Sequence, residues 1–277
     1  MKSGKTSCEK IILYLVLLLT AFLALYPIYV MLMTSMKANQ EIFINPLGLP
    51  KQIYFGGYKK AWLESNFAKY FLNSVIITFI SLFAAELLSI FAAYGLGRFQ
   101  FRTNRMLSVY FLIGMMIPIK LGTVNLFTMM RWLHLFDNLL SVIIVDIAMC
   151  LPLSIFVLTN FVKGIPNALE EAAVLDGCSN SKILMKIILP LIKPALATVT
   201  IMNFLPVWND FYFPLLFLRT DSLKTIPLGV VQFFGEFQTD WNLIFSGLVI
   251  ASLPTMLVYI CMSKQFIEGI TAGAVKG

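Results

Sequence analysis

Long apolar runs separated by polar links dominate the pattern of this chain. A helix that crosses a bilayer needs about 20 apolar residues. Each run is long enough for this, and its apolar residues are spread around all sides of the helix it predicts. The runs fall at residues 11–33, 71–94, 106–127, 139–161, 195–218 and 243–262. Prolines inside or near five of them predict kinked helices. The pattern therefore predicts an all-α, polytopic protein with six transmembrane helices, folded as a single transmembrane domain over residues 1–277 with its core at about 71–262.

Composition excludes the soluble class of proteins. Hydrophobic residues make up 59% of the chain and charged residues 13%, against roughly 25% charged residues in soluble domains. The mean hydropathy is +0.84. The net charge of +7 does not indicate a nucleic-acid partner, because basic residues flank membrane spans and face anionic lipid. Membrane lipid is the expected environment.

No cofactor or metal site is expected within the chain. Its four cysteines and one histidine have no metal-ligand spacing and form no disulfide framework. Gly4-Lys5-Thr6 imitates the end of a phosphate-binding loop, but that motif needs a glycine five residues earlier, which this sequence does not supply. The first apolar run follows three lysines, yet it is too long for a signal peptide and is expected to stay as a helix.

The distribution of basic residues predicts the orientation in the cell membrane. Twelve of the 21 lysines and arginines lie at the chain ends, in the link after the second run (98–105) and in the link after the fourth run (163–193). These segments share one side of the membrane in a six-span topology. The positive-inside rule then places both termini in the cytoplasm.

The link at 163–190 carries the strongest functional signal. Pro166 suits a first helical position, Glu170 and Glu171 favour the positive end of a helix dipole, and Gly177 suits the left-handed residue that ends a helix. Ser179 or Asn180 can cap a second helix.

The first helix of this link has a slim surface. Ala172 and Ala173 let a partner approach its backbone closely, and Glu171 offers an acceptor for a basic group, so the helix suits docking. An ordinary interfacial helix lying on lipid is the alternative interpretation.

The spacing of this link resembles the cytoplasmic "EAA" signature of ABC importer permeases. Residues match at each fixed position: Glu171, Ala172, Ala173, Gly177, Ile187, Leu189 and Pro190. Asn73-Ser74, Trp208-Asn209-Asp210 and the ending at 269–277 also resemble the MalG-like class. Nearly the whole chain thus resembles the MalG-like permease subunits of maltose-type carbohydrate ABC importers, which are binding-protein-dependent transport inner-membrane components.

This resemblance implies a type I importer permease with the MetI-like fold. It implies four kinds of partner: a second homologous permease, two ATP-binding cassette ATPase subunits that bind ATP, an external solute-binding protein and a sugar. It also implies that the EAA loop is a coupling helix seated in a cleft of the ATPase. The coupling residues would be Glu171, Ala172, Ala173, Asp176, Gly177, Ile187, Leu189 and Pro190.

Three acids, Glu86, Asp146 and Asp210, fall inside the predicted spans. Charge at bilayer depth costs roughly 3 kcal/mol on insertion scales, so such groups face a bundle interior or a water-filled path. Lys120 comes at a similar depth to Asp146 and Asp210, which predicts an intramembrane charge pair with one of them, Asp146 first. Interhelical hydrogen bonding is the alternative role for each acid.

The fifth run is the candidate for lining a translocation path. In a continuous helix Asn203 and Asp210 share one face, and Trp208 and Tyr212 share another, with Asn209 between them. Polar groups beside aromatic rings suit a sugar. The alternatives are an interfacial aromatic belt, or a partner permease that holds the main sugar contacts.

The predicted function is a transmembrane permease subunit of an ATP-driven importer for a sugar or oligosaccharide, with no catalytic residues of its own. A polyol or glycerophosphate-type substrate is the alternative within this class. A proton-coupled secondary transporter using the three acids is the alternative from another class. Such carriers often contain internal repeats, and no clear repeat is present.

Overall fold

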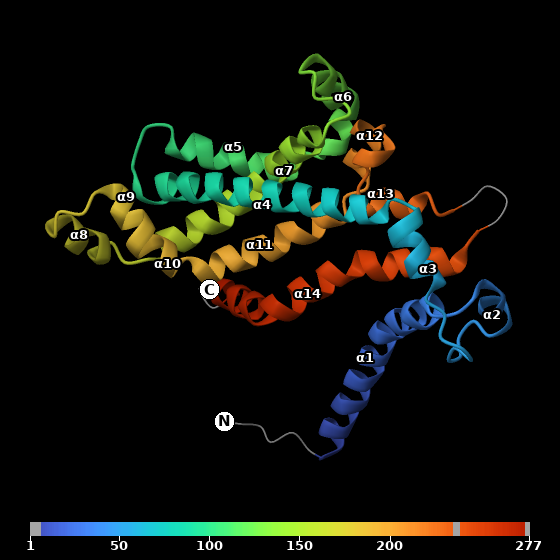
Figure 1. Cartoon of the computed structure of the whole chain (residues 1–277). Helices are drawn as coiled ribbons and strands as arrows, with labels where there is room; N and C mark the ends of the chain where they lie inside the picture. The colour runs from blue at the N-terminus through green and yellow to red at the C-terminus, as the bar shows by residue number, and fades with distance from the viewer. Residues whose placement is uncertain (1–6, 235–238, 275–277) are drawn as a thin grey trace. The chain divides into compact units, whose positions relative to one another are not determined.

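The computed structural model describes the backbone of residues 7–234 and 239–274 and the side chains of 9–234 and 239–262, and every regular element there is a helix (Figure 1). The elements are α1 (Ser7–Ser35), α2 (Asn39–Ile44), α3 (Gly56–Lys59), η1 (Lys60–Glu64), α4 (Phe67–Arg98), α5 (Asn104–Met116), η2 (Ile119–Gly122), α6 (Thr123–Trp132), α7 (Leu139–Lys163), α8 (Ala168–Leu175), α9 (Asn180–Ile183), η3 (Leu184–Ile188), α10 (Leu189–Leu191), α11 (Lys193–Trp208), α12 (Tyr212–Phe217), η4 (Asp221–Leu223), α13 (Ile226–Val231) and α14 (Trp241–Ala274). The predicted all-α class is confirmed.

Four of the predicted runs are single helices long and apolar enough to cross a membrane. They are α1, α4, α7 and α14. The apolar residues of α1 are exposed from Ile11 to Pro27 and mostly partly buried after that. Because such a surface is costly in water, it requires lipid or another apolar chain around it.

The third predicted run is bent and does not form one straight helix. Segments Asn104–Met116 and Ile119–Trp132 meet at 83°. Pro118 lies in the break, and Ile117 before it is extended, with ψ 120°. A proline disfavours the α conformation of the preceding residue, which explains the end of α5.

The fifth predicted run, 195–218, is also wrong as a continuous helix. α11 ends at Trp208, and α12 begins at Tyr212. Asp210 accepts a hydrogen bond from the backbone N–H of Tyr212 at 3.0 Å, a local turn that competes with the helix. Before α11, Asn180–Leu191 meets Lys193–Trp208 at 72°. If each bent pair is one span, the described helices provide up to six spans.

Contacts divide the chain into two compact units. One contains residues up to 68 together with 229–252, and the other contains 69–228 together with the chain from 253 onward.

Polar contacts to Asn242 and Asp240 join distant parts of the first unit. The Asn242 side chain donates to the carbonyl oxygens of Ser35 at 2.9 Å and Lys37 at 2.8 Å. Asp240 accepts from Asn39 at 2.9 Å and Lys60 at 2.8 Å. Burial raises the pKa of Asp240, but these hydrogen bonds outweigh it and the pKa lies below its usual value.

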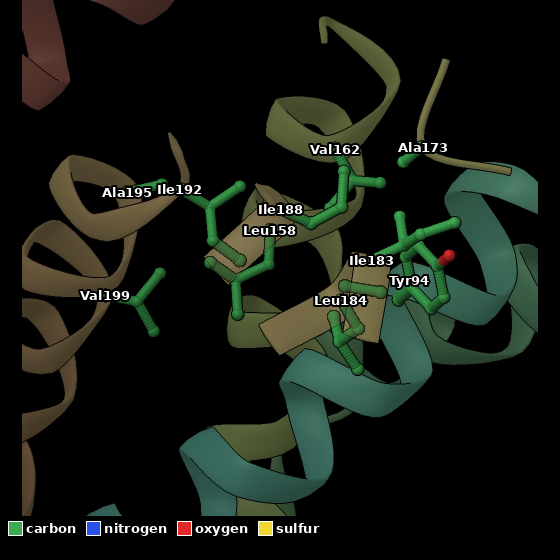
Figure 2. Packing of buried hydrophobic residues seen from close by; sticks show 11 residues of the cluster. Tyr94, Leu158, Val162, Ala173, Ile183, Leu184, Ile188, Ile192, Ala195 and Val199 are labelled. Atoms are coloured by element: carbon green, nitrogen blue, oxygen red, sulfur yellow. The ribbon is translucent and has the colours of Figure 1, made fainter. Parts of the chain in front are cut away.

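The second unit is built around α7, on which α5, α11 and α12 pack. Two apolar clusters lie along this helix. One joins α7 to α4, α11 and the segment 173–192 (Figure 2), and the other joins α7 to α4, α6 and α12. A Cβ on Gly97 would lie 2.7 Å from the Val162 side chain, so this glycine lets α4 approach α7 closely.

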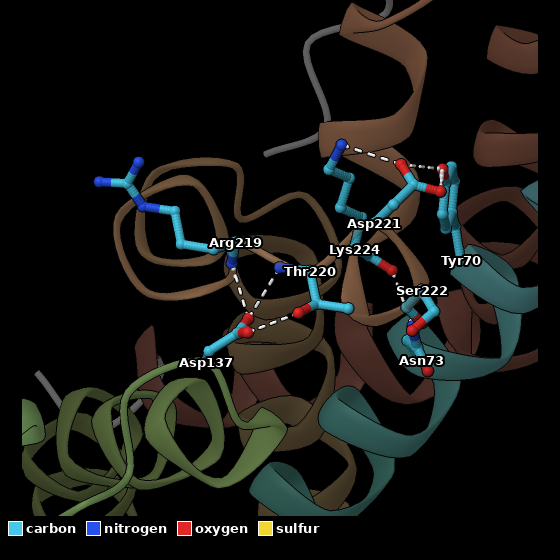
Figure 3. Close-up of polar contacts among 8 residues, drawn as sticks. All are labelled: Tyr70, Asn73, Asp137, Arg219, Thr220, Asp221, Ser222 and Lys224. Atoms are coloured by element: carbon cyan, nitrogen blue, oxygen red, sulfur yellow. Dashed lines mark hydrogen bonds and ion pairs between the residues drawn. The ribbon is translucent and has the colours of Figure 1, made fainter.

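A polar network fixes the segment after α12 (Figure 3). Asn73 on α4 donates to the carbonyl oxygens of Ser222 at 3.0 Å and Lys224 at 2.9 Å. Asp137 accepts the backbone N–H of Arg219 at 2.8 Å and of Thr220 at 2.9 Å.

Hydrogen bonds from the Thr220 side chain and backbone lower the pKa of Asp137 below its usual value. The unfolded chain therefore binds this proton more readily than the folded chain. The stabilisation is complete at neutral pH and is lost as the pH falls through the folded-state pKa.

Candidate coupling loop and membrane cavity

The loop between α7 and α11 contains the predicted helix, turn and second helix. α8 begins at Ala168 with Asn167 at its N-cap position, so Pro166 precedes the helix by two residues and is not its first residue as predicted. Ser179 is at the N-cap position of α9, as one of the two predicted caps, but its side chain makes no capping hydrogen bond.

The predicted left-handed turn at Gly177 is confirmed, with φ at +75°. The N–H of Gly177 donates to Val174 O at 3.0 Å, and the N–H of Cys178 donates to Ala173 O at 2.9 Å. This pair of bonds is a Schellman motif, which satisfies carbonyls at the end of α8. No atom lies within 4 Å of a Cβ built on Gly177, so its conformation alone requires glycine there.

The two alanines of the motif face different ways, which corrects the prediction that both lie on a docking surface. Ala173 is 7% exposed and packs with Tyr94 of α4 and Ile183 of α9 (Figure 2). Ala172 is exposed. Adjacent residues point about 100° apart around a helix, so Ala173 can face the buried cluster while Ala172 points away from it.

The outward surface of α8 includes Glu171, Ala172 and Leu175, followed by Asp176. Leu175 is 88% exposed, although it is a large apolar residue. Such a residue beside exposed acids suits a protein contact. The sequence gives no signal for Leu175, because it is one leucine among many apolar residues.

The later motif residues anchor the loop. Ile187 and Leu189 are partly buried against the cluster that contains Ala173, whereas Pro190 is exposed. The motif therefore contains both an outward surface and an inward anchor.

Arg98, the last residue of α4, clamps the beginning of the loop. Its Nε forms an ion pair with Glu170, and its two Nη atoms donate to Asn167 Oδ1 and Ile165 O, each at 2.9 Å. The side chains of Arg98 and Glu170 are only 9% and 14% exposed. The Tyr94 hydroxyl adds a hydrogen bond to Glu170 at 3.5 Å. This clamp has no signal in the sequence, because its partners lie 72 positions apart and form no local pattern.

A cavity of about 640 Å³ lies among α7, α11 and the segments carrying Lys120 and Tyr212. It brings together Lys120, Asp146, Asn203, Asn209, Asp210 and Tyr212. Asp146 is 3% exposed, and one carboxylate oxygen of Asp146 and one of Asp210 have no hydrogen-bond partner in the described part of the chain. Buried oxygens in this state are strong acceptors for a ligand's hydroxyl or N–H groups.

The predicted ion pair of Lys120 with an acid is not formed. Ion pairs in the described part of the chain are Lys60–Asp240, Arg98–Glu170 and Lys224–Asp221. The Lys120 ammonium instead lies 5.1 Å from the ring centre of Tyr212. The break at Pro118 places Lys120 on η2, and a 2.6 Å hydrogen bond between the hydroxyls of Thr123 and Tyr212 holds the ring nearby.

Trp208 does not line this cavity, so the structure separates it from the other candidate path residues. It is 3% exposed, stacks on Phe204 and meets the ring edge of Phe71, each with centroids 5.9 Å apart. Its predicted partner Tyr212 lies beyond the end of α11, so the two do not share a helical face. The cavity also contains Met149 and Cys150, which the sequence did not single out.

Glu86 is separate from this group. It accepts a short hydrogen bond from Thr200 and is not a lining residue of the cavity. The three acids therefore do not share one site.

The apolar helices and the anchored EAA loop define a membrane permease of the ABC importer class, and not an enzyme. The chain belongs to the family described as "Binding-protein-dependent transport system inner membrane component", which matches residues 86–270.

Among the relatives, the probable ABC transporter permease protein YurM of Bacillus subtilis is 34% identical over 91% of this chain and 84% of its own. The probable starch degradation products transport system permease protein AmyC of Thermoanaerobacterium thermosulfurigenes is 32% identical over 98% of this chain and 99% of its own.

A solved bacterial ABC transporter for import of the acidic polysaccharide alginate contains a chain of the same fold. The TM-score is 0.85, with 23% identity over 96% of this chain and 99% of that one. The MetI-like permease fold predicted from the sequence is confirmed.

The Arg98 clamp predicts coupled effects on stability. Arg98→Met or Glu170→Gln alone should destabilise the detergent-solubilised chain by about 2–3 kcal/mol, because each leaves a nearly buried partner uncompensated. The double variant should lose at least about 1 kcal/mol less than the sum in a thermal unfolding cycle. Arg102→Met, at an exposed arginine, is the control and should have little effect. If the two losses of stability were additive, the ion pair would not stabilise the loop.

The cavity geometry predicts that Lys120 couples to Tyr212 and not to Asp146. A double-mutant cycle of Lys120→Met with Tyr212→Leu should give a coupling of about 0.5–2 kcal/mol, as expected for a cation over a ring. The cycle with Asp146→Asn should be additive to within about 0.5 kcal/mol. Thermal unfolding in detergent measures both cycles. A larger coupling energy with Asp146 than with Tyr212 would support the Lys120–Asp146 ion pair instead.

Proposed function

We propose that this chain is the MalG-like permease subunit of an ATP-driven importer for a sugar or oligosaccharide. The anchored loop carries this proposal: α8 presents Glu171, Ala172 and Leu175 outward, while its other side is fixed to α4 and α7. A partner that moves α8 therefore moves membrane helices with it.

The partners in this proposal are a second homologous permease, two ATPase subunits that bind ATP and an external solute-binding protein. The ATPase takes the outward surface of α8, with a basic group against Glu171. One related solved structure is an alginate transporter in complex with an alginate-bound periplasmic protein, and it supports a binding-protein partner. Both termini and the coupling loop are assigned to the cytoplasm, which the basic residues of the links support.

The substrate class is supported by the relatives and by the cavity. Relatives carry names such as arabinooligosaccharides transport system permease AraQ and melibiose/raffinose/stachyose import permease MelC, both of Bacillus subtilis. In this chain the free oxygens of Asp146 and Asp210 suit sugar hydroxyl groups, which donate hydrogen bonds. Two acids against one lysine disfavour a phosphate anion, and thus the glycerophosphate alternative.

The coupling role predicts variants that insert normally but do not transport. Glu171→Lys places like charges together at the ATPase contact, and Gly177→Val costs roughly 1–2 kcal/mol because a β-branched residue resists the left-handed conformation. Both should reach the membrane in normal amounts, lose sugar uptake and retain less ATPase on purification.

Matched controls separate coupling from general damage. Glu64→Lys reverses an exposed acid outside the loop, and Gly95→Ala adds a Cβ in open space within a helix. Both controls should keep uptake. Full uptake and normal ATPase recovery in either loop variant would refute the role assigned to that residue, and failure to accumulate would favour a purely structural loop.

The proposed orientation predicts one-sided labelling of the loop. In a chain whose other cysteines are changed to serine, Cys178 should react with a membrane-impermeant thiol reagent in inverted vesicles and not in intact cells. Cys178 is partly buried against the loop's cluster, so Ser179→Cys supplies a more exposed thiol at the next position. A chain that retains Cys150 alone should stay unlabelled from both sides, because that thiol is buried. Labelling of position 178 or 179 in intact cells would reverse the topology.

A further inference from the structure

A second pocket, of about 230 Å³, lies apart from the cavity described above, between α5, α7 and the end of α4. Its basic residues are Arg105, the second residue of α5, and Lys163, the last residue of α7. No acid lines it. Neither basic side chain has a hydrogen-bond or ion-pair partner among the described residues.

Polar groups beside the two cations complete an anion site. The Thr159 side chain lines the pocket, is 7% exposed, and its hydroxyl has no hydrogen-bond partner in the described part of the chain. Asn160 supplies a further hydrogen-bonding group. Ser108 also lines the pocket, but its hydroxyl already donates to Asn104 O at 3.0 Å. A buried hydroxyl without a partner is costly, and a ligand oxygen that accepts from it would remove that cost.

The remaining walls are apolar and continue onto an exposed helix. They include Leu112, Phe111 and Phe156. None of the residues of α5 is buried, and its apolar side chains from Met106 to Met116 are exposed except for the partly buried Phe111. A small soluble anion has no apolar part that could contact these walls. The acyl chains of a lipid with an anionic head group would cover them.

We propose that this pocket binds the phosphate head group of an anionic phospholipid, with Arg105 and Lys163 as its cationic ligands and the acyl chains along α5. Basic pockets between membrane helices on the cytoplasmic side are known to suit such head groups. Lys163 leads through four residues to α8, so the lipid lies at the base of the coupling loop. The assignment to the cytoplasmic leaflet rests on the proposed function.

The test uses the assembled importer in mild detergent, with equal amounts of phosphatidylglycerol and phosphatidylcholine, and native mass spectrometry of bound lipid. Phosphatidylglycerol should be retained preferentially. Arg105→Gln and Lys163→Gln should each weaken that retention about fivefold, and the double variant about thirtyfold. Arg105, Lys163 and Arg102 are all exposed, but Arg102 lies in the link before α5 and does not line the pocket, so Arg102→Gln should leave the retention unchanged.

Inorganic phosphate in excess distinguishes the two sources of a phosphate group. It should not displace phosphatidylglycerol, and displacement would assign the pocket to a soluble phosphate compound and overturn the lipid. The proposal would also be overturned if both lipids were retained equally, or if the two single variants kept the same preference for phosphatidylglycerol. If lipid selectivity is lost while sugar uptake stays normal, the lipid site is refuted and the proposed function is unaffected. If the importer retains phosphatidylglycerol but transports no sugar, the proposed function is refuted and the lipid site is unaffected.

Discussion

The seat of α8 on the membrane helices is the interaction on which the rest of the structure depends. Ala173 packs against Tyr94 and Ile183, and Arg98 holds Glu170 from the end of α4. Burial of Ala173 allows α8 to pack closely on the membrane helices, and the ion pair of Arg98 with Glu170 fixes the orientation of α8. A larger side chain at 173 would overpack this contact, which costs typically about 1–3 kcal/mol. In the proposed function, this attachment makes the loop move together with α4 and α7.

The other constraint is the cost of uncompensated charge and polarity in apolar surroundings. This chain meets it in four ways. Arg98 is satisfied within the protein, Lys120 lies over an aromatic ring, and Asp146 faces a cavity. Arg105 and Lys163 lie at helix ends, where an anionic head group can reach them. The described charges within or beside the apolar helices therefore mark places where the chain meets something other than hydrocarbon.

Breaks in the helices decide which side chains reach the cavity. Pro118 ends α5, and the following turn carries Lys120 beside Tyr212. The turn at Asp210 ends the helical pattern after Trp208, so Trp208 stays in the apolar packing while Tyr212 reaches the cavity. A break removes some intrahelical hydrogen bonds of the backbone, and membrane proteins tolerate this where the backbone faces a cavity or protein.

The sequence by itself determined the all-helical membrane class, the four uninterrupted long helices, the left-handed turn at Gly177 and the importer signature. These features depend on local rules: the length of apolar runs, the conformational freedom of glycine and a motif with fixed spacing. Only the tertiary structure decided that Ala173 faces inward, that Arg98 pairs with Glu170, that Trp208 is buried and that Lys120 meets Tyr212. Those outcomes depend on contacts between residues far apart in the chain and on the angles at helix breaks. Hydrophobic periodicity does not contain that information, because in a membrane span both the lipid-facing and the protein-facing sides are apolar.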